Sequence, residues 1–254
     1  MFSLSSLVGR LRAAGCVFAE QEADLIAATA RTPGEATRMA ARRCAGLPLE
    51  HVLGWALFCG LRIQVDPGVF VPRPRTEFLA HQASALLTPH ALAVDLCCGS
   101  GALGAVLAAA RSDITLHAAD IDPAGVACAR RNLPGHNVHQ GDLFAALPPD
   151  LRGRIDVLVA NVPYVPTDRI ALLPPEARLH EARHALDGGA DGLGPVRRVA
   201  AQAREWLAPG GHVLVEVEQE QVPAATAAFT RGGLSCRVHL DHDREAIVLV
   251  AARP

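Results

Sequence analysis

Short apolar runs alternate with helix-like segments from residue 91 to the end of the chain, and this alternation most narrows the folds available to it. The first run, "ALAVDL" (91–96), leads through a glycine-rich turn into a helical pattern from about Ala102. Strands joined by helices pair in parallel, and helices cover both faces of such a sheet. The last two runs, 234–240 and 246–251, are joined by only a few residues, so we expect them to pair antiparallel. Further strands are expected at 114–121, 137–140, 155–161 and 210–218, with helices at 123–132, 195–207 and 222–231.

The first part of the chain has a different pattern. Residues 1–60 show apolar residues at helical spacing and no strand signal. In "LRIQVDPGVFV" (61–71), two short β-type runs flank Asp66, Pro67 and Gly68, which predicts a hairpin, and a helix is expected to follow through Leu87. The chain is therefore divided into a helical domain (1–60), a hairpin with a connecting helix (61–88) and a larger α/β domain (89–254).

Charge and cysteine usage narrow the class of protein. There are 24 basic and 26 acidic residues, and all the basic residues are arginines in scattered pairs, such as Arg42 and Arg43. Broad nucleic-acid surfaces need clustered cations, so direct nucleic-acid binding is not expected. The 7 cysteines lack Cys-x-x-Cys spacing and the start of the chain lacks a secretory pattern, which indicates reduced thiols and a cytoplasmic protein. Residues 91–110 are long enough to span a membrane, but Asp95 and three glycines indicate a buried strand, turn and helix, so no membrane contact is expected.

The turn after the first strand, in "DLCCGSGALG", places Gly99, Gly101 and Gly104 in a Gly-x-Gly-x-x-Gly pattern. Asp120 ends the next strand, where a carboxylate can accept hydrogen bonds from ribose hydroxyls. NAD, FAD and S-adenosylmethionine all share these requirements. Asp95, at the end of the first strand, favours S-adenosylmethionine, because a carboxylate attracts a sulfonium and repels a pyrophosphate.

The antiparallel C-terminal pair is also typical of class I methyltransferases rather than of dinucleotide domains. We therefore expect a Rossmann-like, class I S-adenosylmethionine-dependent methyltransferase fold: a mostly parallel seven-stranded sheet with an antiparallel C-terminal strand, plus a small N-terminal helical domain. Asp142 and Leu143 follow a short strand at the height of the adenine, although Asp142 fits a surface turn nearly as well, and Asp122 is expected to cap the helix that begins at Pro123. The residues expected to bind the cofactor are Asp95, Cys97, Cys98, Gly99, Ser100, Gly101, Asp120, Asp142, Leu143 and Asn161.

The stretch "NVPY" (161–164) directly follows a strand, at the edge of the sheet where open α/β sheets bind their ligands, and it holds the only tyrosine. It resembles the Asn-Pro-Pro-Tyr motif of amino methyltransferases that act on adenine N6, guanine N2 or a glutamine amide. The lone pair of each such nitrogen is delocalised, so the N–H groups must be held while the lone pair is turned toward the methyl group. Asn161 is expected to accept one hydrogen and the Val162 carbonyl the other, while Pro163 stiffens the turn and Tyr164 covers the substrate. Asn161, Pro163 and Tyr164 are thus the predicted catalytic residues, Asn161, Val162, Pro163 and Tyr164 the predicted substrate contacts, and no metal is required.

Several segments together resemble protein N5-glutamine methyltransferases, most closely the peptide chain release factor glutamine methyltransferases. The resemblance runs from about Gly46 to Glu245. It implies a helical N-terminal domain that helps to hold a protein substrate, and a Gly-Gly-Gln loop inserted against "NVPY". The segments are "GLPLEHVLG" (46–54), "FCGLRIQVDPGVFVPRPRTE" (58–77), "DLCCGSGALG", "NVPY", "HEARHALDGGADGL" (180–193) and "LAPGGHVLVEVEQEQ" (207–221).

The chain departs from the family pattern at five positions. Cys97 replaces the first glycine of the cofactor turn, Val162 the first proline of Asn-Pro-Pro-Tyr, and Ala182 the proline after a glutamate. Arg75 stands where the family has glutamate, and Glu218 where it has glycine. The resemblance therefore implies a divergent member whose partner is a release factor, a ribosomal protein or another translation protein.

Other readings remain open from the sequence. The same tetrapeptide suits adenine or guanine as the acceptor, and Cys97 suits a non-catalytic binding module that keeps the fold; a dehydrogenase is a more remote alternative. Glu216 and Gln221 either shape the far wall of the site or simply end a strand. His180 and His184 have helix-face spacing but no third ligand in register, so no metal site is predicted. A monomer or weak dimer is expected.

Overall fold

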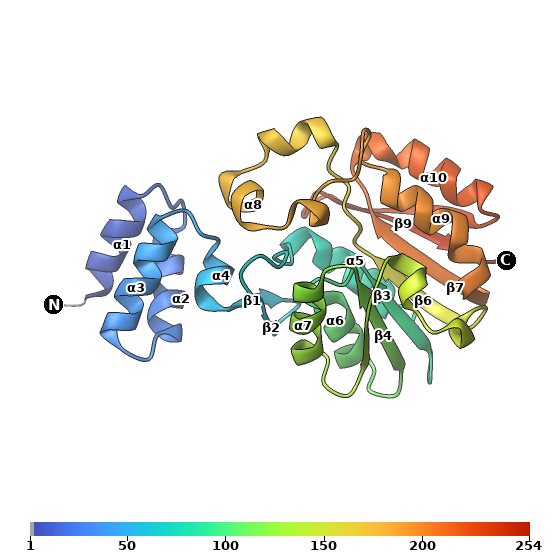
Figure 1. Cartoon of the computed structure of the whole chain (residues 1–254), viewed down its shortest axis with the longest axis horizontal. Coiled ribbons are helices and arrows are strands. Elements are labelled where there is room, and N and C mark those ends of the chain that lie inside the picture. Colours follow the sequence, from blue (N-terminus) through green and yellow to red (C-terminus); the bar gives the residue numbers. More distant parts are fainter. Residues whose placement is uncertain (1–2) are drawn as a thin grey trace.

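The computed structural model describes residues 3–254, which form a helical N-terminal lobe and a larger lobe built around a twisted sheet (Figure 1). The sheet has seven strands in the order β5-β4-β3-β6-β7-β9-β8. Strands β3 to β7 pair in parallel, and β9 pairs antiparallel with both β7 and β8. The predicted mostly parallel sheet with an antiparallel C-terminal strand is confirmed. The strands are β3 (Leu92–Leu96), β4 (Thr115–Asp120), β5 (Asn137–Gln140), β6 (Ile155–Ala160), β7 (Leu207–Glu216), β8 (Ser235–Asp241) and β9 (Ala246–Ala252).

The two faces of the sheet carry separate hydrophobic clusters, because successive side chains of a strand point to opposite faces. In β3, Leu92, Val94 and Leu96 pack into the cluster that contains the buried residues of α9 and α10. Ala93 packs on the other face, with the buried residues of α5 and α6. The central strands β3 and β6 are therefore buried on both sides, as their apolar runs predicted, whereas the edge strands β5 and β8 are partly exposed. The helices of this lobe are α5 (Glu77–Ser84), α6 (Ala102–Ala110), α7 (Pro123–Asn132), α9 (Gly194–Trp206) and α10 (Val222–Arg231).

The N-terminal lobe has its own small core. Leu7, Leu11 and Ile26 are buried in one cluster with Met39. Ser3 caps the first helix and Thr32 the third, each accepting a hydrogen bond from a backbone N–H in the first turn. The helices are α1 (Leu4–Ala13), α2 (Ala19–Thr29), α3 (Pro33–Cys44) and the short α4 (Leu49–Leu53).

The hairpin lies earlier than predicted. β1 (Trp55–Phe58) pairs antiparallel with β2 (Leu61–Gln64), so the expectation of a hairpin across 61–71 and of no strand before residue 61 was wrong. The turn consists of Cys59 and Gly60, both with positive φ; cysteine is an unusual residue there, so the turn gave no sequence signal. Asp66 does begin a turn, accepting from the Val69 N–H at 3.1 Å, but the chain beyond it continues without a strand.

The segment 167–193 was expected to be a long loop of weak periodicity. It contains two short 3₁₀ helices, at Thr167–Leu172 and Arg183–Ala185, and the helix α8 (Pro175–His180). Isolated bridges Gly68↔Glu181 and Val165↔Asp187 attach it to the rest of the chain. Between residues 3 and 254, none of the helices has the length and apolar character that crossing a membrane requires.

Candidate active site

A cavity opens at the carboxyl ends of β3 and β6, where the strand order reverses direction and open α/β sheets hold their ligands. It encloses about 840 Å³ of empty space, a figure that includes the open solvent at its mouth. The two segments that the sequence singled out meet in its wall. The predicted residues found there are Cys97, Cys98, Gly99, Ser100, Asp120, Asn161, Val162, Pro163 and Tyr164.

The glycine turn between β3 and α6 is a left-handed bend. Cys97 has φ of 56°, Gly99 of 50° and Gly101 of 79°, all in the region that glycine adopts freely and other residues avoid. A Cβ added to Gly99 would meet no described atom within 4 Å, so a ligand can approach the backbone closely there. Burial raises the pKa of the Cys97 and Cys98 thiols, with the carboxylates of Asp120 and Asp95 adding to the effect. Both thiols are therefore protonated, neutral parts of the wall.

Asp120 presents its carboxylate to the cavity from the end of β4. Its Oδ2 accepts from the Gly99 N–H at 2.7 Å and its Oδ1 from the Asp122 N–H at 2.8 Å. Burial raises the pKa of Asp120, and the two backbone hydrogen bonds oppose that shift. Asp122 itself caps α7 by accepting from the Ala124 N–H at 2.9 Å, which confirms the prediction for that residue.

Asn161 stands just past the end of β6. Because Ala160 pairs with Val215 of β7, Asn161 and Glu216 leave adjacent strands at the same height. The Asn161 Nδ2 lies 3.5 Å from the hydroxyl oxygen of Thr76. The opposite atom, Oδ1, is buried, and no group in residues 3–254 donates a hydrogen bond to it.

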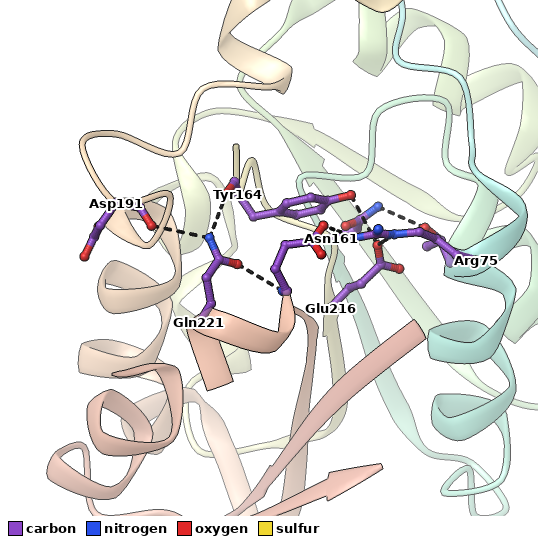
Figure 2. Close-up of polar contacts among 8 residues, drawn as sticks. Arg75, Asn161, Tyr164, Asp191, Glu216 and Gln221 are labelled. Carbon is purple, nitrogen blue, oxygen red and sulfur yellow. Dashed lines mark hydrogen bonds and ion pairs between the residues drawn. The ribbon is translucent and has the colours of Figure 1, made fainter. Parts of the chain in front are cut away.

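The side-chain hydroxyl and the backbone carbonyl of Tyr164 both form hydrogen bonds (Figure 2). Its hydroxyl donates to Glu216 Oε1 at 3.3 Å, and its carbonyl accepts from Gln221 Nε2 at 2.8 Å. Burial raises the pKa of the Tyr164 phenol, and the Glu216 carboxylate raises it further, so the ring is neutral. Of the two open readings for Glu216 and Gln221, this geometry supports the one in which they shape the site.

Comparisons with known proteins place this arrangement in a family. The Methyltransferase small domain model matches residues 60–193. The release factor glutamine methyltransferase of Mycolicibacterium smegmatis is 40% identical over 209 residues, which cover 81% of this chain and 74% of that protein. The chain belongs to the release factor glutamine methyltransferase family. It is accordingly a methyltransferase whose methyl donor is S-adenosylmethionine.

One further relative and one solved structure are also similar to this chain. A 4-amino-L-phenylalanine/4-methylamino-L-phenylalanine methyltransferase of Streptomyces pristinaespiralis is 36% identical over 201 residues, covering 76% of this chain and 68% of that protein. A methyltransferase structure from Pyrococcus furiosus is 18% identical with a TM-score of 0.58, covering 77% of this chain and 90% of that one. That structural likeness shows the fold alone, and the fold is the predicted class I methyltransferase fold.

In this family member, four predicted cofactor residues lie outside the described cavity wall: Asp95, Gly101, Asp142 and Leu143. Asp95 is fully buried and its Oδ2 accepts from the Gly104 N–H at 2.9 Å, so it ties β3 to the start of α6. Burial raises the pKa of Asp95 to about 7. Asp142 is exposed and pairs with Arg198, Nη2 to Oδ2 at 2.5 Å, which is the surface-turn alternative. Their roles toward the cofactor stay predictions.

Other wall residues were not singled out from the sequence. Thr76 follows Arg75 in "PRPRTE", and Leu186 lies in "HEARHALDGG", so both were inside quoted motifs without being assigned a role. Ile121 directly follows Asp120, and that adjacency was an available signal. Phe58 and Phe70 lie in the quoted segment 58–77, but they were not assigned a role there. Among residues 3–254, no three metal-ligating side chains lie grouped together.

Proposed function

We propose that this protein transfers the methyl group of S-adenosylmethionine to the side-chain amide nitrogen of a glutamine in a protein, in the Gly-Gly-Gln loop of a peptide chain release factor. The proposal rests on family membership and on one observation, the buried Oδ1 of Asn161 that receives no hydrogen bond from the described residues. A buried acceptor without a donor is costly, so it calls for a ligand that brings an N–H group. A primary amide supplies two N–H groups.

The residues present fit the donor. S-adenosylmethionine, when bound, supplies a methyl group on a positively charged sulfur. The open backbone at Gly99 lets a cofactor lie against the turn, and the Asp120 carboxylate suits ribose hydroxyls. Cys98 and Ser100, on either side of Gly99, also line the cavity.

The acceptor nitrogen needs orientation more than acid–base help, because an amide lone pair is delocalised. Asn161 Oδ1 would take one N–H hydrogen, and the Val162 carbonyl the other, which turns the lone pair toward the methyl group. Thr76 keeps the Asn161 amide group in the orientation that leaves Oδ1 free, since Nδ2 faces its hydroxyl. Pro163 limits the backbone of this turn, and the Tyr164 ring would cover the plane of the acceptor amide.

The N-terminal lobe is the proposed holder of the protein substrate. Helices α1–α4 form a core separate from that of the sheet lobe, and Figure 1 shows them projecting to one side of it. A release factor loop would reach the cavity while its body contacts this lobe.

The test is methyl transfer from labelled S-adenosylmethionine to purified release factor, followed by mass spectrometry of the Gly-Gly-Gln peptide. One added methyl group on the glutamine is expected, and a release factor with Gly-Gly-Asn at that place is the matched control. Label on nucleic acid alone, or on free 4-amino-L-phenylalanine alone, would contradict the proposal. A heat signal with S-adenosylmethionine but no transfer to any acceptor would favour a binding module.

A further inference from the structure

Tyr164 is the single tyrosine of the chain, and four other residues fix its position. The guanidinium carbon of Arg75 lies 5.2 Å from the centre of its ring. Glu216 holds its hydroxyl and Gln221 its carbonyl. Gly192 lies so close to that carbonyl that an added Cβ would collide with it. Ring, hydroxyl and backbone are therefore each restrained by a different segment.

The guanidinium of Arg75 forms ion pairs with two carboxylates of the protein itself. Its Nε donates to Glu216 Oε1 at 2.8 Å, and its Nη2 donates to Glu218 Oε1 at 2.7 Å. The Glu216 side chain is only 1% exposed, so its charge is balanced by Arg75 and not by water. Burial opposes the charged form of Arg75, but the carboxylates of Glu216 and Glu218 prevail and the pKa of Arg75 is raised.

Arg75 and Glu218 thus meet in space although they are 143 residues apart in sequence. A glutamate at position 75 would face Glu216 and Glu218, three carboxylates together, which is strongly unfavourable in a partly buried place. Arg75 therefore provides the positive charge that this pair of carboxylates needs.

We propose that Arg75 and Glu218 are a coupled pair of positioning residues: Glu218 holds Arg75, and Arg75 holds Glu216 and the Tyr164 ring against the acceptor site. The charge of Arg75 then serves the interior of the site and does not set the choice of protein partner. The kinetic part of this inference rests on the proposed function.

A double-mutant cycle on methyl transfer tests the coupling. Arg75→Gln is expected to lower kcat by roughly tenfold to a hundredfold, since a displaced Tyr164 no longer fixes the reacting geometry, with the KM for release factor within about twofold. Glu218→Gln should have a smaller effect alone and no further effect when combined with Arg75→Gln. Arg75→Glu should be the worst single change, and Arg75→Glu with Glu218→Gly should recover at least roughly tenfold by removing the facing carboxylate.

A second readout does not need enzyme activity. Because the chain has one tyrosine, protein labelled with ¹³C at tyrosine Cζ gives one resonance, which reports on Tyr164 alone. Arg75→Gln and Glu218→Gln should both move it. Arg62→Gln should leave it in place, because Arg62 lies 4.1 Å over Trp55 in the hairpin, a comparable stacked arginine away from the cavity.

Failure of this inference and failure of the proposed function give different results. A wild-type protein that methylates no release factor contradicts the proposed function, while the Tyr164 resonance still tests the pair. A raised KM or altered acceptor choice in Arg75→Gln, with kcat and the resonance unchanged, would show that Arg75 contacts the substrate and would overturn the inference. Additive kinetic effects of the two glutamine substitutions would contradict the coupling.

Discussion

Arg43 of α3 donates through Nη1 to Glu176 of α8, at 2.5 Å, and so joins the N-terminal lobe to the segment that follows "NVPY" (161–164). The same guanidinium also binds Glu22 of α2, Nε to Oε2 at 2.7 Å. The Arg43 and Glu22 side chains are each 10% exposed, whereas Glu176 is 44% exposed. One arginine therefore has a buried partner within its lobe and a more exposed one beyond it.

The two partners of Arg43 should differ in their contribution to stability. Arg43→Met is expected to lower the free energy of unfolding by about 3 kcal/mol, because it leaves the Glu22 carboxylate buried without a counter-charge. Glu176→Gln should cost less than about 1 kcal/mol, as exposed pairs do. Urea unfolding of both variants measures the difference, and equal losses would contradict it.

The N-terminal lobe is the proposed holder of the protein substrate, and Glu176 joins that lobe to the segment beside the cavity. Glu176→Gln should therefore also raise the KM for release factor more than it lowers kcat.

Asn161 should dominate the chemistry. Asn161→Ala is expected to lower kcat by roughly a hundredfold to a thousandfold, the usual cost of removing one aligned polar contact at a reacting centre. Thr76→Val, nearly the same shape without the hydroxyl, should lower kcat less, by allowing the amide to turn. Calorimetric affinity for S-adenosylmethionine should be retained in Thr76→Val. If Asn161→Ala keeps near-normal kcat, the assigned role is wrong.

Gly192 and Gly189 provide a matched pair close to Tyr164. Both have positive φ, 74° and 88°, so alanine strains the backbone similarly at each. At Gly192 the new Cβ also meets the Tyr164 carbonyl and Gln221 Nε2, whereas at Gly189 no described atom lies within 4 Å. Gly192→Ala should therefore move the tyrosine resonance and cost roughly tenfold or more in kcat beyond Gly189→Ala. Equal behaviour of the two variants would show that this contact does not position Tyr164.

Cys97 has a glycine-like backbone, with φ of 56°. Cys97→Gly should therefore stabilise the protein by about 0.5–1 kcal/mol, the relief of left-handed strain less the extra entropy of glycine in the unfolded chain. Cys98 lacks this positive φ, and Cys98→Gly should be destabilising. Chemical denaturation under reducing conditions compares the two, and a loss of stability in Cys97→Gly would contradict the strain argument.

Asp95 should make stability depend on pH. Its ordinary pKa of 3.8 is raised to about 7 by burial, so the folded protein holds the proton more tightly than the unfolded chain between these values. The contribution is fully present below pH 3.8 and is lost as pH rises through about 7, at no more than about 1.4 kcal/mol per pH unit. Asp95→Asn keeps an acceptor for the Gly104 N–H and removes the titration. The stability of the wild type relative to this variant should fall from pH 4 to 8; a rise would refute the assignment.

The centre of the sheet could be predicted because strands such as β3 and β6 are apolar runs, and a strand buried on both faces leaves that mark in sequence. The hairpin could not, since its turn depends on the backbone of Cys59, an unusual residue for positive φ, while the more familiar Asp66 turn starts no strand. The sequence pattern of a segment therefore predicted whether that segment forms a strand, but it did not predict where the chain turns.

"NVPY" and the glycine turn were recognisable because each is continuous in sequence, and strand order brings them to one edge. The support of Tyr164 was not recognisable. Arg75, Glu216 and Glu218 each looked like an isolated feature, and only the fold brings them into contact. In the same way, Thr76 was quoted within a motif, but its closeness to Asn161 depends on tertiary packing.

The cavity wall draws on Phe58 from the hairpin and on Leu186 from the segment after α8, as well as on the strand ends between them. No half of the chain forms the whole cavity wall alone, so the complete cavity exists only when early and late segments have docked. A bound donor should then stabilise the early and the late segment together against unfolding. Donor binding would thus favour the fully docked chain, and Leu186→Ala, which trims the wall but keeps every strand, should reduce the donor-induced rise in melting temperature.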